Sequence, residues 1–199
     1  MATIGLSKPW CAKYVYDEST DTVSYSDGFS IGKYTDMSIE LEGGDANNFY
    51  ADNGVDESDK TFAGGTMNTT TNDLLADKMV SLLGLRSESI TGADGASWMV
   101  FDDDQQIPEI AQGGVIKKKI KGVTKWVAFV LPRIQYANPG IAAVTQGETI
   151  EWQTQSLSAT IMRSDGPGHR WFQISTPFDT EAAAEAAVKA FLGITEVSS

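Results

Sequence analysis

The chain has little of what most catalytic and metal sites are made from. Its 199 residues include one cysteine, Cys11, and one histidine, His169. One cysteine excludes a disulfide within the chain and a cysteine metal cluster. His169 follows a Gly-Pro-Gly turn near Asp165, and no serine or cysteine lies in a nucleophile context, so we interpret it as a surface or packing residue. We therefore predict neither enzyme activity nor a bound cofactor.

Long apolar runs and basic residues are also scarce. No run approaches the roughly 18 apolar residues of a membrane span. The N-terminal segment lacks the features of a signal peptide, so we expect assembly in a cytosol without a membrane partner. The 27 acidic residues outnumber the 15 basic ones, for a net charge of −12, and 12 acidic but only 4 basic residues fall in residues 1–60. Such a chain repels nucleic acid rather than gripping it.

The most informative stretch runs from residue 35 to residue 84. Residues 35–42 alternate between apolar and polar, which predicts a half-buried strand. The apolar side carries Met37, Ile39 and Leu41, and the polar side carries Asp36, Ser38, Glu40 and Glu42. A second β-like run covers residues 61–71, and leucine and methionine spacing predicts a helix over 75–83 that ends at Gly84.

Residues 43–60 separate these two strands and show no periodicity. Eighteen such residues form a long loop for a compact domain, and long loops are usually functional or disordered. Phe49, Tyr50 and Val55 lie among its acidic residues, which favours docking over disorder. The partner surface is either another molecule or the loop's own domain.

The remaining pattern predicts further strands and a C-terminal helix. Residues 9–16 read as a first strand, and residues 23–26 and 29–33 read as a hairpin around Asp27-Gly28. Residues 124–131 are apolar on both faces, which requires cover from a helix or a neighbouring subunit. A change of phase near Gln155-Ser156 indicates a β-bulge, and residues 180–192 form an alanine-rich helix. We predict a mainly β fold in a single domain, 1–199: an antiparallel β-sandwich or barrel with a flanking α-helix and a C-terminal helix.

Two acidic groups and the tryptophans are candidate binding features. Calcium takes oxygen ligands, but neither acidic group has EF-hand spacing, so we predict solvated loops and no metal. The groups are Asp102, Asp103 and Asp104, and Asp52, Asp56 and Asp59. The tryptophans are scattered at strand positions, which indicates core packing: Trp10, Trp98, Trp126, Trp152 and Trp171.

The one basic cluster surrounds Lys117, Lys119 and Lys121, which share a face if residues 113–123 form a strand. Three interpretations stay open. The cluster is a nucleic-acid or phosphate patch, a sheet edge protected by lysines, or a surface that meets acidic residues of a neighbouring copy. The last matches the uneven charge along the chain.

One run joins several of these features: SIELEGGDANNFYADNGVDESDKTFAGGTMNTTTNDL. A Glu-rich strand precedes Phe49-Tyr50-Ala51-Asp52-Asn53, and a Phe-x-x-Gly-Thr strand at 62–66 precedes a helix that opens with Asp73-Leu74-Leu75. This run resembles the central segment of the major tail proteins, or tail tube proteins, of long-tailed phages of Gram-positive bacteria, the phi13-like group. The IGLSKPWCAKY start and residues 178–192 are also similar to that group.

The resemblance implies a β-sandwich with a flanking helix. It also implies hexameric rings whose sheets join into an inner β-barrel, stacked into a tube through which DNA leaves the capsid without specific binding. Implied partners are further copies of the chain, a tape measure protein, a tail terminator and distal tail or baseplate proteins. The implied location is the virion tail, after assembly in the host cytoplasm.

The resemblance also assigns roles to residues, none of them catalytic. The loop at 43–60 takes the position of an inter-subunit contact, with Phe49, Tyr50, Asp52, Asn53, Val55 and Asp56 as its candidate residues. Asp36, Glu40 and Glu42 are candidates for an acidic lumen that does not grip DNA. Two alternatives stay open: a monomeric β-sandwich binding or adhesion module, marked by grouped exposed aromatics, and the tube of a DNA-free phage-derived particle.

Overall fold

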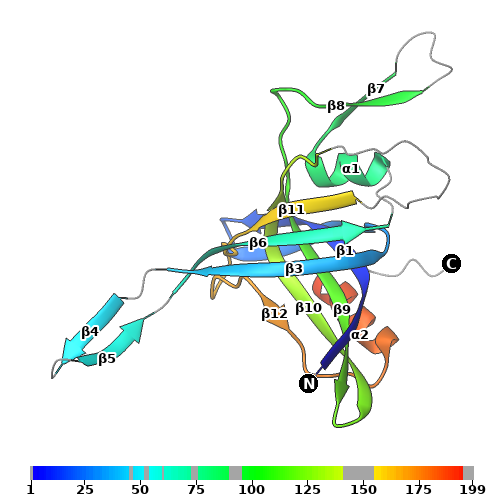
Figure 1. Ribbon diagram of the computed structural model, residues 1–199. Helices are drawn as coiled ribbons and strands as arrows, with labels where there is room; N and C mark the ends of the chain where they lie inside the picture. Colours follow the sequence, from blue (N-terminus) through cyan, green and yellow to red (C-terminus); the bar gives the residue numbers. More distant parts are fainter. Residues whose placement is uncertain are drawn as a thin grey trace, which may run out of the picture.

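The computed structural model describes residues 2–44, 47–51, 54–59, 61–72, 76–89, 96–140 and 155–194, with backbone alone at 47–51, 54–59, 76 and 155. One antiparallel sheet dominates (Figure 1). Its strands are β1 (Ala2–Asp17), β2 (Thr22–Ser30), β3 (Tyr34–Gly43), β6 (Phe62–Thr71), β9 (Glu109–Ile120), β10 (Val123–Tyr136), β11 (Gln155–Ile161) and β12 (Gln173–Ile174). The order is β2-β1-β9-β10-β11-β6-β3, with β12 paired to β10. The predicted mainly β, antiparallel fold is confirmed.

Two hairpins project from this sheet as arms. One pairs β4 (Asn47–Ala51) with β5 (Gly54–Asp59), and the other pairs β7 (Arg86–Ser89) with β8 (Ser97–Val100). Figure 1 shows the first beyond the ends of β3 and β6, and the second beyond helix α1 (Ala76–Leu83). The prediction of a loop without secondary structure at 43–60 was therefore wrong. The pairing register slips between Phe49 and Tyr50, which removes the strict period of two that reveals a strand.

The sheet curls so that its two halves face each other like the layers of a sandwich. The start of β3 lies against β9, where Gln112 Nε2 donates to the hydroxyl of Tyr34, the first residue of β3, at 2.7 Å. Apolar side chains of both halves and of α1 fill the space between them. The largest fully buried members of this main core are Tyr136, Ile31, Met67, Leu82, Leu83, Ile110, Leu131, Ile134, Leu157 and Ile161.

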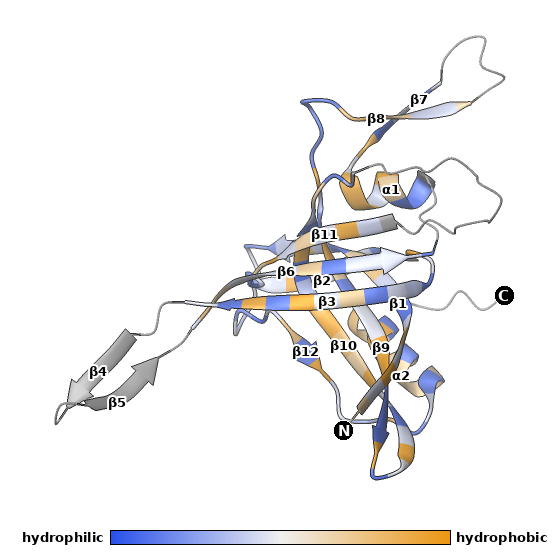
Figure 2. Cartoon of the chain, in the orientation of Figure 1, coloured by the Kyte–Doolittle hydropathy of each residue, from blue (hydrophilic) through white to orange (hydrophobic). Residues whose placement is uncertain are grey.

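A second core lies on the opposite face of β9 and β10, under helix α2 (Glu181–Phe191). Its buried side chains are Ala12, Ala111, Val115, Ala128, Val130, Ala184, Val188 and Leu192. Residues 124–131 were predicted to be covered on both faces. This prediction is confirmed for Val127 to Leu131, all of which are buried. The cover is the chain's own helix. Figure 2 shows the hydrophobic colour concentrated along β10 and alternating along β3.

Helix α2 has a side-chain cap at its start, and a glycine follows the end of each helix. Thr180 caps α2 by accepting a hydrogen bond from the N–H of Ala183 at 3.2 Å. Gly193 follows α2 with a φ of 64°, and Gly84 follows α1 with a φ of 65°. This left-handed conformation suits glycine, which has no Cβ to clash.

Two local predictions about β1 and β2 were wrong. Asp27-Gly28 does not turn a hairpin; it forms a bulge inside β2, because the pairing moves from Cys11–Phe29 to Lys13–Ser26. Asp27 has a φ of 49°, which is a left-handed backbone conformation. Turns and bulges both use this conformation, so the same dipeptide suits either. The first strand begins at Ala2, well before the predicted Pro9, which lies at a second bulge. A proline is tolerated there because a bulge interrupts the ladder. The bulge predicted near Gln155-Ser156 stays a prediction, because residues 141–154, just before β11, lie outside the described residues.

Candidate assembly surfaces

Strands β3 and β2 end the path of the main sheet, so each presents one edge that no described strand covers. On β3 the predicted alternation is confirmed as far as Glu40, but Leu41, predicted on the buried side, is 47% exposed. Met37 and Ile39 are half-buried against the main core, and the candidate lumen residues Asp36, Glu40 and Glu42 are exposed on the other face. An unpaired edge offers a row of backbone donors and acceptors to another strand.

The outward face of β3 continues across β6 and β11 as one polar surface. Asp36 lies opposite Thr70, and Glu40 lies opposite Thr66. The exposed or half-exposed residues of this polar face are Asp36, Ser38, Glu40, Glu42, Thr66, Asn68, Thr70, Ser156, Ser158 and Thr160. None of the three strands contains a lysine or an arginine. The polar face is therefore acidic and hydroxyl-rich, without a basic side chain of its own to hold a phosphate.

The basic cluster occupies the tip of the β9–β10 hairpin. Lys117, Lys119 and Lys121 are exposed and follow the predicted alternation. β9 pairs with β1 on one side and β10 on the other, so the cluster does not protect a sheet edge, and that interpretation was wrong. Lys125 pairs with Asp179, and the ammonium of Lys117 lies 6.0 Å from the centre of the Trp126 ring. The remaining interpretations are a phosphate patch and a subunit contact.

The β4–β5 arm is inserted at a single point in the sheet. The N–H of Gly44 donates to the carbonyl of Thr61 at 2.7 Å, so the two ends of the insertion meet. Asp52 and Asn53 lie outside the described residues, as do the side chains of Phe49, Tyr50, Val55 and Asp56. The arm is thus an addition to the sheet edge rather than a link within the core.

The β7–β8 arm is a surface that the sequence pattern did not reveal. Trp98, predicted to be a core residue, is 54% exposed, and Phe101 is 44% exposed. Of the described strand residues in this arm, only Met99 packs against the main core, and it is partly buried. Residues 98–101 are all apolar, as in a buried strand, but an apolar run does not show whether a second layer covers the strand. Trp10, Trp126 and Trp171 are partly buried against the two cores, as predicted.

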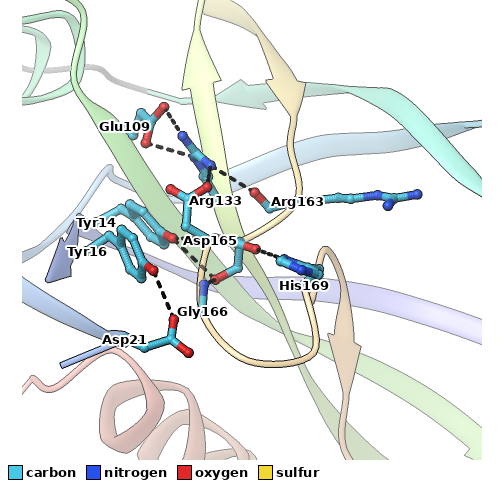
Figure 3. Close-up of polar contacts among 10 residues, drawn as sticks. Tyr14, Tyr16, Asp21, Glu109, Arg133, Arg163, Asp165, Gly166 and His169 are labelled. Carbon is cyan, nitrogen blue, oxygen red and sulfur yellow. Dashed lines mark hydrogen bonds and ion pairs between the residues drawn. The ribbon is translucent and has the colours of Figure 1, made fainter. Parts of the chain in front are cut away.

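An ion-pair cluster around Arg133 fastens the loop after β11 to the sheet (Figure 3). The guanidinium donates to both carboxylate oxygens of Glu109, at 2.8 and 2.7 Å, and to Asp165 at 2.6 Å. It also donates to the carbonyl of Arg163 and lies 5.2 Å from the centre of the Tyr14 ring. The hydrogen bonds to Glu109 raise the pKa of Arg133, although partial burial opposes them. The cluster therefore holds β1, β9, β10 and the loop together, and we call it the Arg133 clamp.

His169 lies at the rim of this clamp. Its Nδ1 is 3.1 Å from the carbonyl oxygen of Ser164, and its φ is 43°. Its ring therefore meets backbone rather than the Asp165 carboxylate, in agreement with the prediction of a packing or surface residue. Among the described residues, no three histidine, cysteine, aspartate or glutamate side chains are placed to hold one metal ion.

A buried polar chain ties β3 to the middle of the sheet. Gln112 Nε2 donates to the hydroxyl of Tyr34 at 2.7 Å, and the hydroxyl of Tyr136 donates to Gln112 Oε1. Burial raises the pKa of both tyrosines, and also that of the Cys11 thiol beside them. Because every member stays neutral and bonded, the chain fixes where β3 begins relative to β9 and β10.

Comparisons with known proteins add no identification. No family model matches the chain, and no curated protein matches it. Within the described residues, no helix has the length and hydrophobicity needed to span a membrane.

Proposed function

We propose that this chain is a structural virion protein that polymerises as stacked, hexameric rings and so forms the tail tube of a phage, the function implied by the sequence resemblance. The observation that carries the proposal is the polar face of β3, β6 and β11, which borders the uncovered edge of β3. A tube that conducts DNA needs a lining that does not bind phosphate, and these three strands carry no lysine or arginine.

The free edge of β3 supports the same assignment. In the proposed ring, β3 pairs with a strand of the neighbouring copy, so the sheet continues from subunit to subunit and the acidic residues Asp36, Glu40 and Glu42 face the bore. Closure into a ring removes open edges, which otherwise invite uncontrolled pairing. In a monomer this edge of β3 stays uncovered by any described strand.

The two arms support self-association further. A hairpin that extends away from its own body gains little from that body, and a two-stranded hairpin is marginally stable by itself. The β4–β5 arm carries the sequence that the resemblance assigns to an inter-subunit contact. In this account both arms are stabilised by neighbouring copies in the ring or the stack.

The proposal also places the protein among partners. Other copies of the chain are its principal contacts, and the tape measure protein, tail terminator and distal tail or baseplate proteins are its expected neighbours in the virion tail, after assembly in the host cytoplasm. DNA passes through the lumen without specific binding. The tube of a DNA-free phage-derived particle uses the same assembly.

The test is the state of the purified chain at increasing concentration. Sedimentation velocity is expected to show conversion of monomers into large particles, and negative-stain electron microscopy is expected to show rings or hollow tubes. Compact monomers at every concentration would overturn the proposal and favour the monomeric binding module.

A further inference from the structure

We propose that the two ends of the molecule bind each other head to tail, so that the β7–β8 end of one copy docks on the β9–β10 tip of the next. This inference rests on the proposed function, because it names the surfaces that join successive rings. The occupant of each surface is a second copy of this chain.

The first surface, the arm end, combines exposed aromatics with acidic side chains. Trp98 and Phe101 are 54% and 44% exposed at the arm and its exit. Asp103 and Asp104 are exposed in the turn that follows, without an ion pair among the described residues. Arg86 pairs with both Asp102 and Glu88, so it does not neutralise these two carboxylates. The arm end thus has a negative rim beside an uncovered apolar patch.

The second surface, the basic tip, has the complementary composition. Lys119 and Lys121 are exposed at the end of the β9–β10 hairpin and have no ion pair among the described residues. Val123 and Ile4 beside them are 55% and 50% exposed. Ala2 to Gly5 of β1 pair with Lys117 to Lys119 of β9, which brings Ile4 to this tip. The basic tip therefore also exposes apolar side chains, and its charge is positive where that of the arm end is negative.

The two surfaces lie at opposite ends of the body. Residues 101–108 lead directly into the start of β9, and Lys121 follows its last residue, Ile120. Twelve residues of extended strand span roughly 40 Å. Figure 1 shows β7 and β8 at one extreme of the molecule and the turn between β9 and β10 at the other.

This placement determines what the contact builds. Different surfaces at opposite ends make a heterologous contact, which repeats without closing and produces a linear stack. Two copies that met through the same end would instead place lysines against lysines or carboxylates against carboxylates. Charge complementarity therefore favours one polarity along the stack, and apolar burial of Trp98 and Val123 adds affinity.

The test is a charge exchange in the full-length protein. The first variant carries D103K and D104K, and the second carries K119E and K121E; none of these four side chains has an ion-pair partner among the described residues. Each variant alone presents like charges at both ends. An equimolar mixture again pairs opposite charges, because the basic arm end of the first variant meets the acidic tip of the second. E18K, in the exposed turn after β1, is the control.

We expect each double variant to need about a tenfold higher concentration for stacking, so that it stops at single rings where the wild type forms tubes. The equimolar mixture should form tubes again. W98S should weaken stacking in the same way, and circular dichroism and thermal melting check that each variant folds. Wild-type stacking by both double variants, or failure of the mixture to rescue, would overturn this contact while leaving ring formation intact.

Other outcomes separate this inference from the proposed function. Wild-type filaments without rings would retain the head-to-tail contact and refute the ring. A wild-type chain that stays monomeric would refute both. If K119E/K121E stacks normally but loses binding to a DNA duplex that the wild type retains, the basic tip is a phosphate patch and the inference is wrong.

Discussion

The indole N–H of Trp10 donates to the carboxylate of Glu185 at 3.1 Å, which joins β1 to helix α2. The ammonium groups of Lys8 and Lys189 lie 3.0 and 3.3 Å from the same carboxylate. Helix α2 covers the second core, so this carboxylate sits where the helix is fastened to the sheet. Its charge state therefore bears on the stability of the body that any assembly needs.

Glu185 makes stability depend on pH in a defined direction. Burial alone would raise its pKa, but hydrogen bonds from Lys8, Trp10 and Lys189 outweigh burial and lower the pKa below its ordinary value of 4.5. The contribution of a carboxylate with a lowered folded-state pKa is complete above the unfolded pKa and is lost as pH falls through the folded one. We expect E185Q to lower the free energy of unfolding at pH 7 by about 1 kcal/mol and to flatten its decline below pH 4.5. Urea titrations of dilute protein measure both effects, and unchanged pH dependence would contradict the assignment; E18Q is the control.

The contact between α2 and the sheet also depends on Gly113. A Cβ placed there lies 2.7 Å from Val188 Cγ1 and 2.9 Å from the carbonyl oxygen of Phe129. We expect Gly113→Ala to lower the free energy of unfolding by about 1–3 kcal/mol through overpacking. Gly43 has open space around its Cβ position, so Gly43→Ala should change stability by less than about 0.5 kcal/mol. Equal effects of the two substitutions would show that α2 does not pack as closely as described.

The clamp around Arg133 should contribute far more to the free energy of unfolding than an exposed ion pair does. Arg133→Gln leaves the carboxylates of Glu109 and Asp165 beside each other without their shared cation, and we expect a loss of about 2–3 kcal/mol. Lys13→Gln removes an exposed pair with Asp27 and should cost less than about 0.5 kcal/mol. Chemical denaturation compares them. A loss for Arg133→Gln no larger than that for Lys13→Gln would refute the clamp.

Removal of the β4–β5 arm should separate folding from assembly. Because Gly44 and Thr61 are hydrogen-bonded to each other, replacement of residues 45–60 by an Asn-Gly turn leaves the sheet closed. We expect a melting temperature close to that of the wild type and no growth of tubes. Thermal melting and electron microscopy of the same sample measure the two properties. Normal polymerisation of the deletion variant would refute the docking role of the arm.

Charge reversal on the polar face tests its assignment to the lumen. E40K/E42K places two cations on a surface that has none, and we expect assembled tubes of this variant to retain DNA duplexes at low salt and release them at high salt. Wild-type tubes and E18K tubes should not retain DNA. Co-sedimentation of labelled DNA with the tubes is the readout, and identical retention by all three would place Glu40 and Glu42 away from the bore.

The sequence pattern predicted elements well where a core imposes its period. The alternation of Met37 and Ile39 with their polar neighbours, and the two-sided apolarity of Val127 to Leu131, were both read correctly because burial dictates them. The pattern did not reveal what provides the cover. Residues 124–131 required a second layer, but only the three-dimensional arrangement shows that α2 is that layer.

The errors arose where one local signal serves two structures. Asp27-Gly28 favours left-handed backbone, which a turn and a bulge use alike. Trp98 begins an apolar run, residues 98–101, as a core tryptophan can, yet its hairpin extends away from the sheet and its side chain is exposed. The shared face of Lys117, Lys119 and Lys121 was predicted. Edge protection is excluded because β9 pairs with β1, about 100 residues earlier in the chain, as well as with its hairpin partner β10, and the local pattern does not show the pairing with β1.

A reconstruction of the assembled protein by cryo-electron microscopy would show directly how the copies join. We expect rings in which β3 of one copy pairs with a strand of the next, while Asp36, Glu40 and Glu42 line a continuous bore. Assemblies whose bore is lined by the α2 side of the sheet, or in which β3 keeps an unpaired edge, would contradict this expectation.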